Sequence, residues 1–158
     1  MSSMSAGSAA DEAGRGSPSL RRARVALGAF IAWTLFVWIG RIRNALADPE
    51  LEGAKRVWPL LLAVSFLVPA AALAVAWVDS RRGGRWIVPW ASVLVRALTA
   101  WTIGVWVLRV ADIALGGDWS VGFVAVHTVL GVVSATLAVW ATLADRAVAR
   151  ERVATPAS

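Results

Sequence analysis

Four long apolar runs occupy most of this 158-residue chain, and they constrain its fold more than any other feature. The first lies between Arg24 and Arg41, and the others cover 57–78, about 94–115 and about 121–143. A hydrocarbon core about 30 Å thick requires about 20 helical residues to cross it. Because lipid offers no hydrogen-bond partners, each spanning segment must satisfy its own backbone as a helix. The sequence therefore predicts an all-α membrane protein, a four-transmembrane-helix bundle.

The composition agrees with a membrane protein and excludes several kinds of site. Apolar residues make up 58% of the chain and charged residues 16%, against roughly 45–50% and 25% in soluble domains. There is no cysteine, which excludes disulfides, thiol catalysis and cysteine metal sites. The net charge of +6 does not indicate a nucleic-acid partner, because the arginines flank the apolar runs instead of gathering on one soluble surface. Lys55 is the only lysine, and the bias toward Arg, Ala and Val suggests a GC-rich bacterial genome.

The sequence predicts a membrane domain between two tails. Residues 1–20 are mostly small and polar, without periodicity, so we expect a disordered N-terminal tail. The four-helix transmembrane domain is expected at 21–147, and a short cytoplasmic C-terminal tail at 148–158. Within the domain, two hairpins are expected at about 24–78 and about 86–144.

The first loop, ADPELEGAKR, begins like a helix N-terminus. Asp48 is a preferred N-cap residue, and Pro49 is favoured at the first helical position. The sequence therefore predicts a short exposed helix in this loop, which we interpret as a connector and not a binding element.

The distribution of basic residues predicts the orientation of the chain in the membrane. The N-terminal tail, second loop and C-terminal tail hold ten basic residues, whereas the first and third loops with their helix ends hold five. The positive-inside rule places both termini of this multi-pass cell-membrane protein in the cytoplasm. The alternative is a cleaved secretory signal that ends at Ala45-Leu46-Ala47. Arg41 and Arg43, which separate the apolar run from that motif, argue against cleavage.

Two similar strings, AWTLFVWIGRIRNAL at 32–46 and AWTIGVWVLRVADIAL at 100–115, predict a tandem repeat of a two-helix hairpin. Two tryptophans and an arginine match at one constant offset, and VWPLLLAVS at 57–65 resembles VHTVLGVVS at 126–134. On a helix the matched residues fall on one face, opposite Ile103, Val107 and Val110, which are merely apolar. We therefore expect the matched face to point into the bundle. Because each copy has an even number of spans, the two copies are expected to run parallel.

This hairpin unit resembles a family of short, uncharacterised actinobacterial membrane proteins, each a single two-helix hairpin. The resemblance is carried by Val126, His127, Leu130 and Ser134 in the last apolar run. The first half departs from it, because Trp58 stands where the second half has His127. The resemblance implies a hairpin fold and no activity.

The candidate site is a polar cluster of Arg109, Asp112 and His127. Arg109 and Asp112 are spaced i,i+3, so they can pair on one helical face. His127 lies about two turns into the next helix, which starts on the same side of the membrane. Ionisable residues at membrane depth are candidates for function, and the alternative is an interfacial arginine tied to an aspartate, with a histidine hydrogen-bonded between helices. The equivalent residues in the first copy are Arg41, Asn44 and Trp58.

No spacing in the sequence indicates catalysis, a phosphate loop or a cofactor. We therefore expect a non-enzymatic accessory or interaction subunit, whose partners are the lipid bilayer and another membrane protein or a second copy of itself. The alternative is a minimal transporter or channel for a small solute or ion, since duplicated hairpins with a polar cluster are compatible with transport.

Overall fold

The computed structural model of the protein describes residues 18–51, 53–82, 86–116 and 119–154. These residues form four helices, α2 (Pro18–Ala47), α3 (Ala54–Arg82), α4 (Pro89–Leu115) and α5 (Val121–Ala154). Each helix is long and apolar enough to cross a membrane. The predicted all-α fold with four spans is confirmed.

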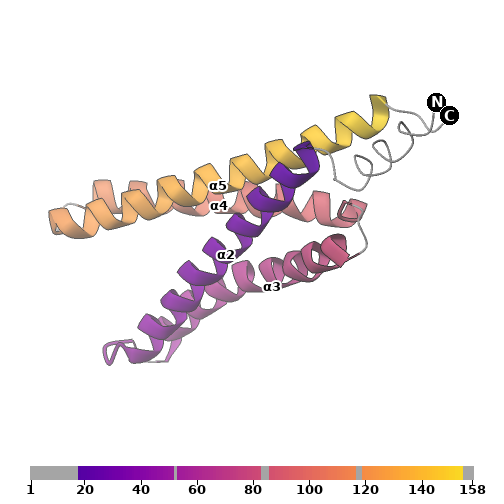
Figure 1. The fold of residues 1–158 in the computed structure, drawn as a ribbon. Helices are drawn as coiled ribbons and strands as arrows, with labels where there is room; N and C mark the ends of the chain where they lie inside the picture. The colour runs from indigo at the N-terminus through magenta and orange to yellow at the C-terminus, as the bar shows by residue number, and fades with distance from the viewer. Residues whose placement is uncertain (1–17, 52, 83–85, 117–118, 155–158) are drawn as a thin grey trace, which may run out of the picture.

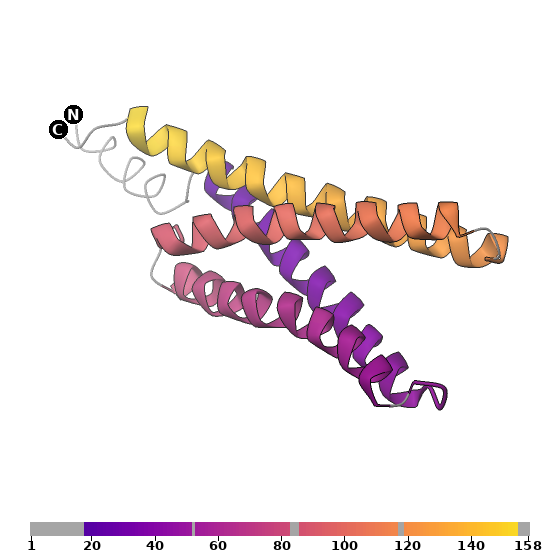
Figure 2. The same ribbon diagram turned by 180° about the vertical axis from the view of Figure 1, so that it is seen from behind.

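The four helices pack as two hairpins that meet along one seam (Figure 1). Helix α2 packs on α3, α4 packs on α5, and α2 also packs on α5, whereas α3 and α4 share a much smaller contact. The start of α2, the end of α3, the start of α4 and the end of α5 gather at one end of the molecule (Figure 2). The hairpins diverge toward their loops, so the two hairpins are closest to one another at the opposite end, where these four helix ends gather.

The first and last helices each extend into a segment that the sequence analysis assigns to a tail. Helix α2 begins at Pro18, inside the tail predicted at 1–20, and α5 continues to Ala154, through most of the tail predicted at 148–158. The extension of α5 has a physical reason, because Val148 is buried in the core and the surrounding Ala, Arg and Glu residues favour helix. The predicted disorder of 1–17 lies outside the described residues.

The first loop contains a turn where the sequence predicts a short helix, so that prediction is wrong over the described part of the loop. The Asp48 carboxylate accepts a hydrogen bond from the Glu50 backbone N–H at 3.0 Å, and its carbonyl accepts one from the Leu51 N–H at 3.4 Å. Gly53 then adopts a φ of 51°, the left-handed region that favours glycine. The side chain that was expected to cap a helix instead closes a turn, and α3 begins directly afterwards.

The face shared by the two similar strings points into the bundle at its threonines and at the second tryptophan of each string, as predicted, whereas Trp101 is 47% exposed and Arg41 is also exposed. Thr34 and Thr102 are buried, and each hydroxyl donates to the carbonyl four residues earlier in its helix, at 2.8 Å and 2.7 Å. Trp38 and Trp106 are buried as well, whereas Val107 on the opposite face is exposed. Lipid requires only apolar residues, while a packed face restricts side-chain shape.

Burial repeats along the chain at the spacing that separates Trp38 from Trp106. Every buried residue of α4 has a buried counterpart at this spacing in α2. In the second helix of each hairpin, five buried residues of α3 likewise correspond to five of α5, namely Ala63, Phe66, Ala70, Leu73 and Ser80 with Gly131, Ser134, Ala138, Ala141 and Val148. In the second helix of each hairpin, this alignment by burial is shifted by one residue from the alignment by identical residues. It pairs Trp58 with Val126 and places His127 opposite Pro59, because one residue rotates a helix by about 100°.

Candidate functional site

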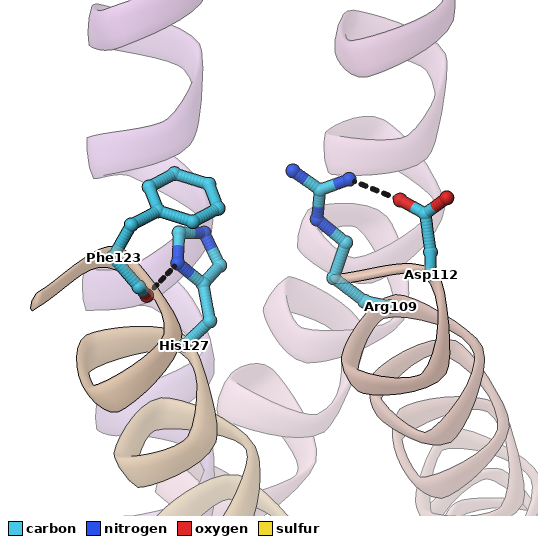
Figure 3. Close-up of polar contacts among 4 residues, drawn as sticks. All are labelled: Arg109, Asp112, Phe123 and His127. Carbon is cyan, nitrogen blue, oxygen red and sulfur yellow. Dashed lines mark hydrogen bonds and ion pairs between the residues drawn. The ribbon is translucent and has the colours of Figure 1, made fainter. Parts of the chain in front are cut away.

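The predicted Arg109–Asp112 ion pair is present near the end of α4. Arg109 Nη1 donates to Asp112 Oδ2 at 2.8 Å, and the side chains are 34% and 65% exposed (Figure 3). The Arg109 guanidinium also lies 5.9 Å from the ring centroid of Trp119, just before the start of α5. The arginine is therefore neutralised within its own helix, and solvent or headgroups reach both charges.

His127 does not join this ion pair. A ring nitrogen, Nδ1, lies 2.9 Å from the backbone carbonyl of Phe123, one turn earlier in α5. Since a carbonyl only accepts, Nδ1 carries the hydrogen. No hydrogen bond or ion pair connects His127 with Arg109 or Asp112 among the residues that the structure describes, and Figure 3 shows the two groups on separate helices. The predicted cluster of three is therefore an ion pair and a separate histidine.

An aromatic ladder links the two groups indirectly. In the first two turns of α5, the His127 ring packs on Phe123 with centroids 4.0 Å apart, and Phe123 stacks at 4.4 Å on Trp119, which precedes the helix. Trp119 is the ring that Arg109 approaches. These contacts are apolar and tilted or stacked, so they fix the start of α5 against the end of α4 without a polar path between His127 and the ion pair.

The corresponding end of the first hairpin has no ion pair. Arg41 and Asn44 are both exposed, and neither has a salt bridge among the described residues. Trp58, the third predicted equivalent, is largely exposed on α3. The predicted first-copy set thus does not form a cluster.

A buried carboxylate that the sequence reasoning missed lies at the other end of the molecule. Asp145 on α5 is only 4% exposed, and its Oδ1 accepts hydrogen bonds from Trp86 Nε1 and Ser92 Oγ, both at 2.8 Å. Trp86, which precedes α4, is buried. The three residues tie the last part of α5 to the start of α4. We refer to them as the Asp145 node.

One turn closer to the middle of the membrane, the same helices share a second polar contact. The hydroxyls of Thr99 and Thr142 are 2.9 Å apart, and Thr99 Oγ1 donates to the Ala138 carbonyl at 3.1 Å. Asp145, Thr142 and Ala138 recur at helical spacing on one face of α5. This periodicity is the sequence signal for the Asp145 node, although Asp145 lies just beyond the apolar run that ends at about residue 143.

Two tryptophans connect the hairpins to one another. Trp33 Nε1 on α2 donates to Ser134 Oγ on α5 at 2.9 Å, and Trp101 Nε1 on α4 donates to Ser65 Oγ on α3 at 3.1 Å. The two bonds are reciprocal, since each tryptophan reaches the second helix of the other hairpin. Their surroundings differ, because Ser134 is buried and Ser65 is exposed.

The described residues contain no group of three His, Asp or Glu side chains placed to hold a metal ion. Comparison with known proteins found no matching family model, no matching curated protein and no matching solved structure. The family resemblance therefore rests on the sequence motif alone. The chain is an all-α protein with four candidate membrane spans, in contact with the lipid bilayer.

Proposed function

We propose that the protein is a non-enzymatic accessory or interaction subunit of the bacterial cytoplasmic membrane. One observation carries this proposal: the buried polar side chains within the spans are occupied by internal hydrogen bonds. Thr34 and Thr102 bond within their own helices, and Thr99 bonds to Thr142 across the α4–α5 contact. Ser134 is occupied by a tryptophan of the other hairpin. Such groups stabilise helix packing and are not directed at a solute.

The outer surface of the helices supports an interaction role. The most apolar windows of α2, α3 and α4 are 33%, 28% and 33% buried inside the chain, whereas that of α5 is only 17% buried. Helix α5 therefore has the largest share of apolar surface available to lipid or to another helix. We propose that its outward face contacts another membrane protein or a second copy of this chain.

The orientation and the origin of the hairpins belong to the same proposal. The excess of arginine in the tails and second loop supports cytoplasmic termini. The recurrence of buried positions at one spacing supports a tandem duplication of a two-helix unit, of the kind found in the small actinobacterial family that the motif resembles.

A second candidate function, a minimal transporter or channel for a small solute or ion, is favoured by Asp145. This side chain is ionisable and almost fully buried, and ionisable residues inside membrane spans often mark transport paths. Its position argues against transport. Asp145 lies in the last third of α5, toward the end of the molecule where the four helix ends gather, whereas transport sites usually lie near the midplane.

Affinity purification from cross-linked membranes tests the interaction role. We expect a stoichiometric membrane partner, or a second copy, whose recovery is lost in Val132→Trp on the exposed face of α5. Val68→Trp, an equally exposed position on α3, is the matched control and should retain the partner. A protein that purifies as a lone chain and gives substrate-dependent flux in proteoliposomes, sensitive to Asp145→Asn, would establish the transporter instead.

A further inference from the structure

Arg96 is a charged residue inside a membrane span that the bundle does not neutralise. It lies two turns into α4, within an apolar run, and its side chain is exposed. Its one hydrogen bond within the protein runs from Nε to the Ser92 carbonyl at 3.1 Å. No acidic side chain pairs with it among the described residues. A lone arginine in lipid is costly, so the membrane itself must supply a partner.

The direction of the side chain indicates where that partner lies. Ser92 is one turn closer than Arg96 to the end of the molecule at which the start of α2, the end of α3, the start of α4 and the end of α5 gather. A turn advances about 5.4 Å along the helix, so the guanidinium reaches back from the hydrocarbon toward the headgroups of that leaflet. Its Nε is occupied by the Ser92 carbonyl, which leaves the two terminal nitrogens available as a donor fork.

Further positive charge flanks the same stretch of the α4–α5 contact. Ser92 is bonded through its hydroxyl to Asp145, and the residue after Asp145 is the exposed Arg146. Arg150 follows one turn later and is also exposed. Asp145 itself is buried and occupied by two neutral donors, so it forms no salt bridge with these arginines. Exposed arginines on both helices therefore border one contact, and the acid within that contact, Asp145, is buried.

We propose that Arg96 and Arg146 form a binding site for the phosphodiester headgroup of an anionic phospholipid. A guanidinium fork binds phosphate oxygens through two parallel charge-assisted hydrogen bonds, and basic groups between helices at the membrane surface favour anionic lipids. The acyl chains would lie along the exposed apolar face of α4 and α5, which carries Val93, Val139 and Leu143. This inference is independent of the proposed interaction role, because it concerns a lipid and not a protein partner.

Native mass spectrometry of the full-length protein released from nanodiscs of phosphatidylcholine and phosphatidylglycerol tests the proposal. We expect one phosphatidylglycerol to remain bound to the wild type in preference to phosphatidylcholine. Arg96→Gln should weaken this binding about tenfold or more, as expected for loss of a charged hydrogen-bond pair. Arg96→Lys should lie between the two, because it keeps the charge and loses the fork. Arg43→Gln, an exposed arginine at the loop end of α2, is the matched control and should retain the lipid.

Three outcomes would overturn the proposal. Equal retention of both lipids by the wild type would remove the preference, and equal losses in Arg96→Gln and Arg43→Gln would show a general charge effect. Displacement of the bound lipid by inorganic phosphate alone would assign the site to a small anion. If Arg96→Gln fails to fold, Arg146→Gln is measured in its place, and unchanged binding there contradicts a two-arginine site.

Discussion

The two hairpins bury the same positions but close their shared end with different chemistry. In the first hairpin, Trp77 Nε1 donates to the Arg24 carbonyl at 2.8 Å, and the Arg24 guanidinium donates to the Ser80 carbonyl at 2.8 Å. At the corresponding positions of the second hairpin, Ser92 donates to the carboxylate of Asp145. The first contact uses backbone acceptors, which every residue provides, whereas the second depends on one buried side chain.

The loop ends of the hairpins differ in a similar way. Arg109 is paired with Asp112 one turn away, whereas Arg41 has Asn44 at the corresponding position and no ion pair. Helix packing restricts size and shape at the buried positions, so these are alike in both hairpins. Polar groups near the membrane surface have water and headgroups as alternative partners, so their chemistry is free to differ. Asp145 is the exception, because it is buried and water cannot take its place as the acceptor for Trp86 and Ser92.

The Asp145 node gives the largest expected effect. Asp145→Leu leaves the Trp86 and Ser92 donors without their acceptor, and we expect a loss of about 3 kcal/mol in the free energy of unfolding. Asp145→Asn keeps a carbonyl oxygen and should cost clearly less. Equilibrium unfolding in mixed detergent micelles measures both. Equal losses in the two variants would show that volume, and not the acceptor, stabilises this end of the hairpin.

Glycines at the helix contacts give the next effect. A Cβ added at Gly28 would lie 2.9 Å from the Trp77 ring, and one at Gly131 would lie 3.1 Å from Trp106. Gly28→Ala and Gly131→Ala should each destabilise the fold by about 1–3 kcal/mol through overpacking. Gly104, which has nothing within 4 Å, is the control, and Gly104→Ala should be neutral or stabilising. The same unfolding measurement decides, and a neutral Gly28→Ala would mean that the tryptophan moves aside.

The two tryptophan bonds between hairpins should be unequal. Trp33→Phe leaves the buried Ser134 without its donor, and a membrane side-chain hydrogen bond of this kind is worth about 0.6–1.7 kcal/mol. Trp101→Phe should cost no more than about 0.6 kcal/mol, the lower end of the same range, because Ser65 is exposed and already donates to the Leu62 carbonyl at 2.7 Å. Thermal unfolding of the two variants checks the order. A larger loss for Trp101→Phe than for Trp33→Phe would show that the bond to the exposed Ser65 contributes more than the bond to the buried Ser134.

The ion pair at the end of α4 should have the smallest effect. Asp112→Asn recreates the chemistry of the first hairpin, and the fold should survive it. In a double-mutant cycle with leucine at both positions, we expect a coupling of about 0.2–1 kcal/mol for such an exposed pair. Asp112→Leu should cost more than Arg109→Leu, because the former strands the less exposed Arg109 guanidinium, whereas the latter strands the more exposed Asp112 carboxylate. Strictly additive losses would show that the pair is not coupled.

The four spans and the buried faces of their helices could be predicted from the sequence, because lipid requires long apolar segments. The contacts of single polar side chains could not. The four spans follow from the length of the apolar runs, and the inward face of Trp38 and Trp106 follows from their matched spacing. The position of His127 does not follow, because a carbonyl one turn back competes with the ion pair for its hydrogen. The burial of Asp145 could not be predicted either, because it depends on the continuation of α5 beyond the apolar run. The packing of Val148 stabilises this continuation, and a hydropathy pattern does not show it.

Cysteine accessibility in intact cells tests the four-span architecture most directly, because the native chain has no cysteine. Single cysteines are placed at exposed positions in both hairpin loops, Glu50→Cys and Ser120→Cys, and between the hairpins, Arg82→Cys. A membrane-impermeant maleimide should label the two loop positions in intact cells and Arg82→Cys only after the membrane is opened. Labelling of the two loop positions from opposite sides would contradict the four-span bundle. Labelling of Arg82→Cys alone in intact cells would contradict the cytoplasmic termini.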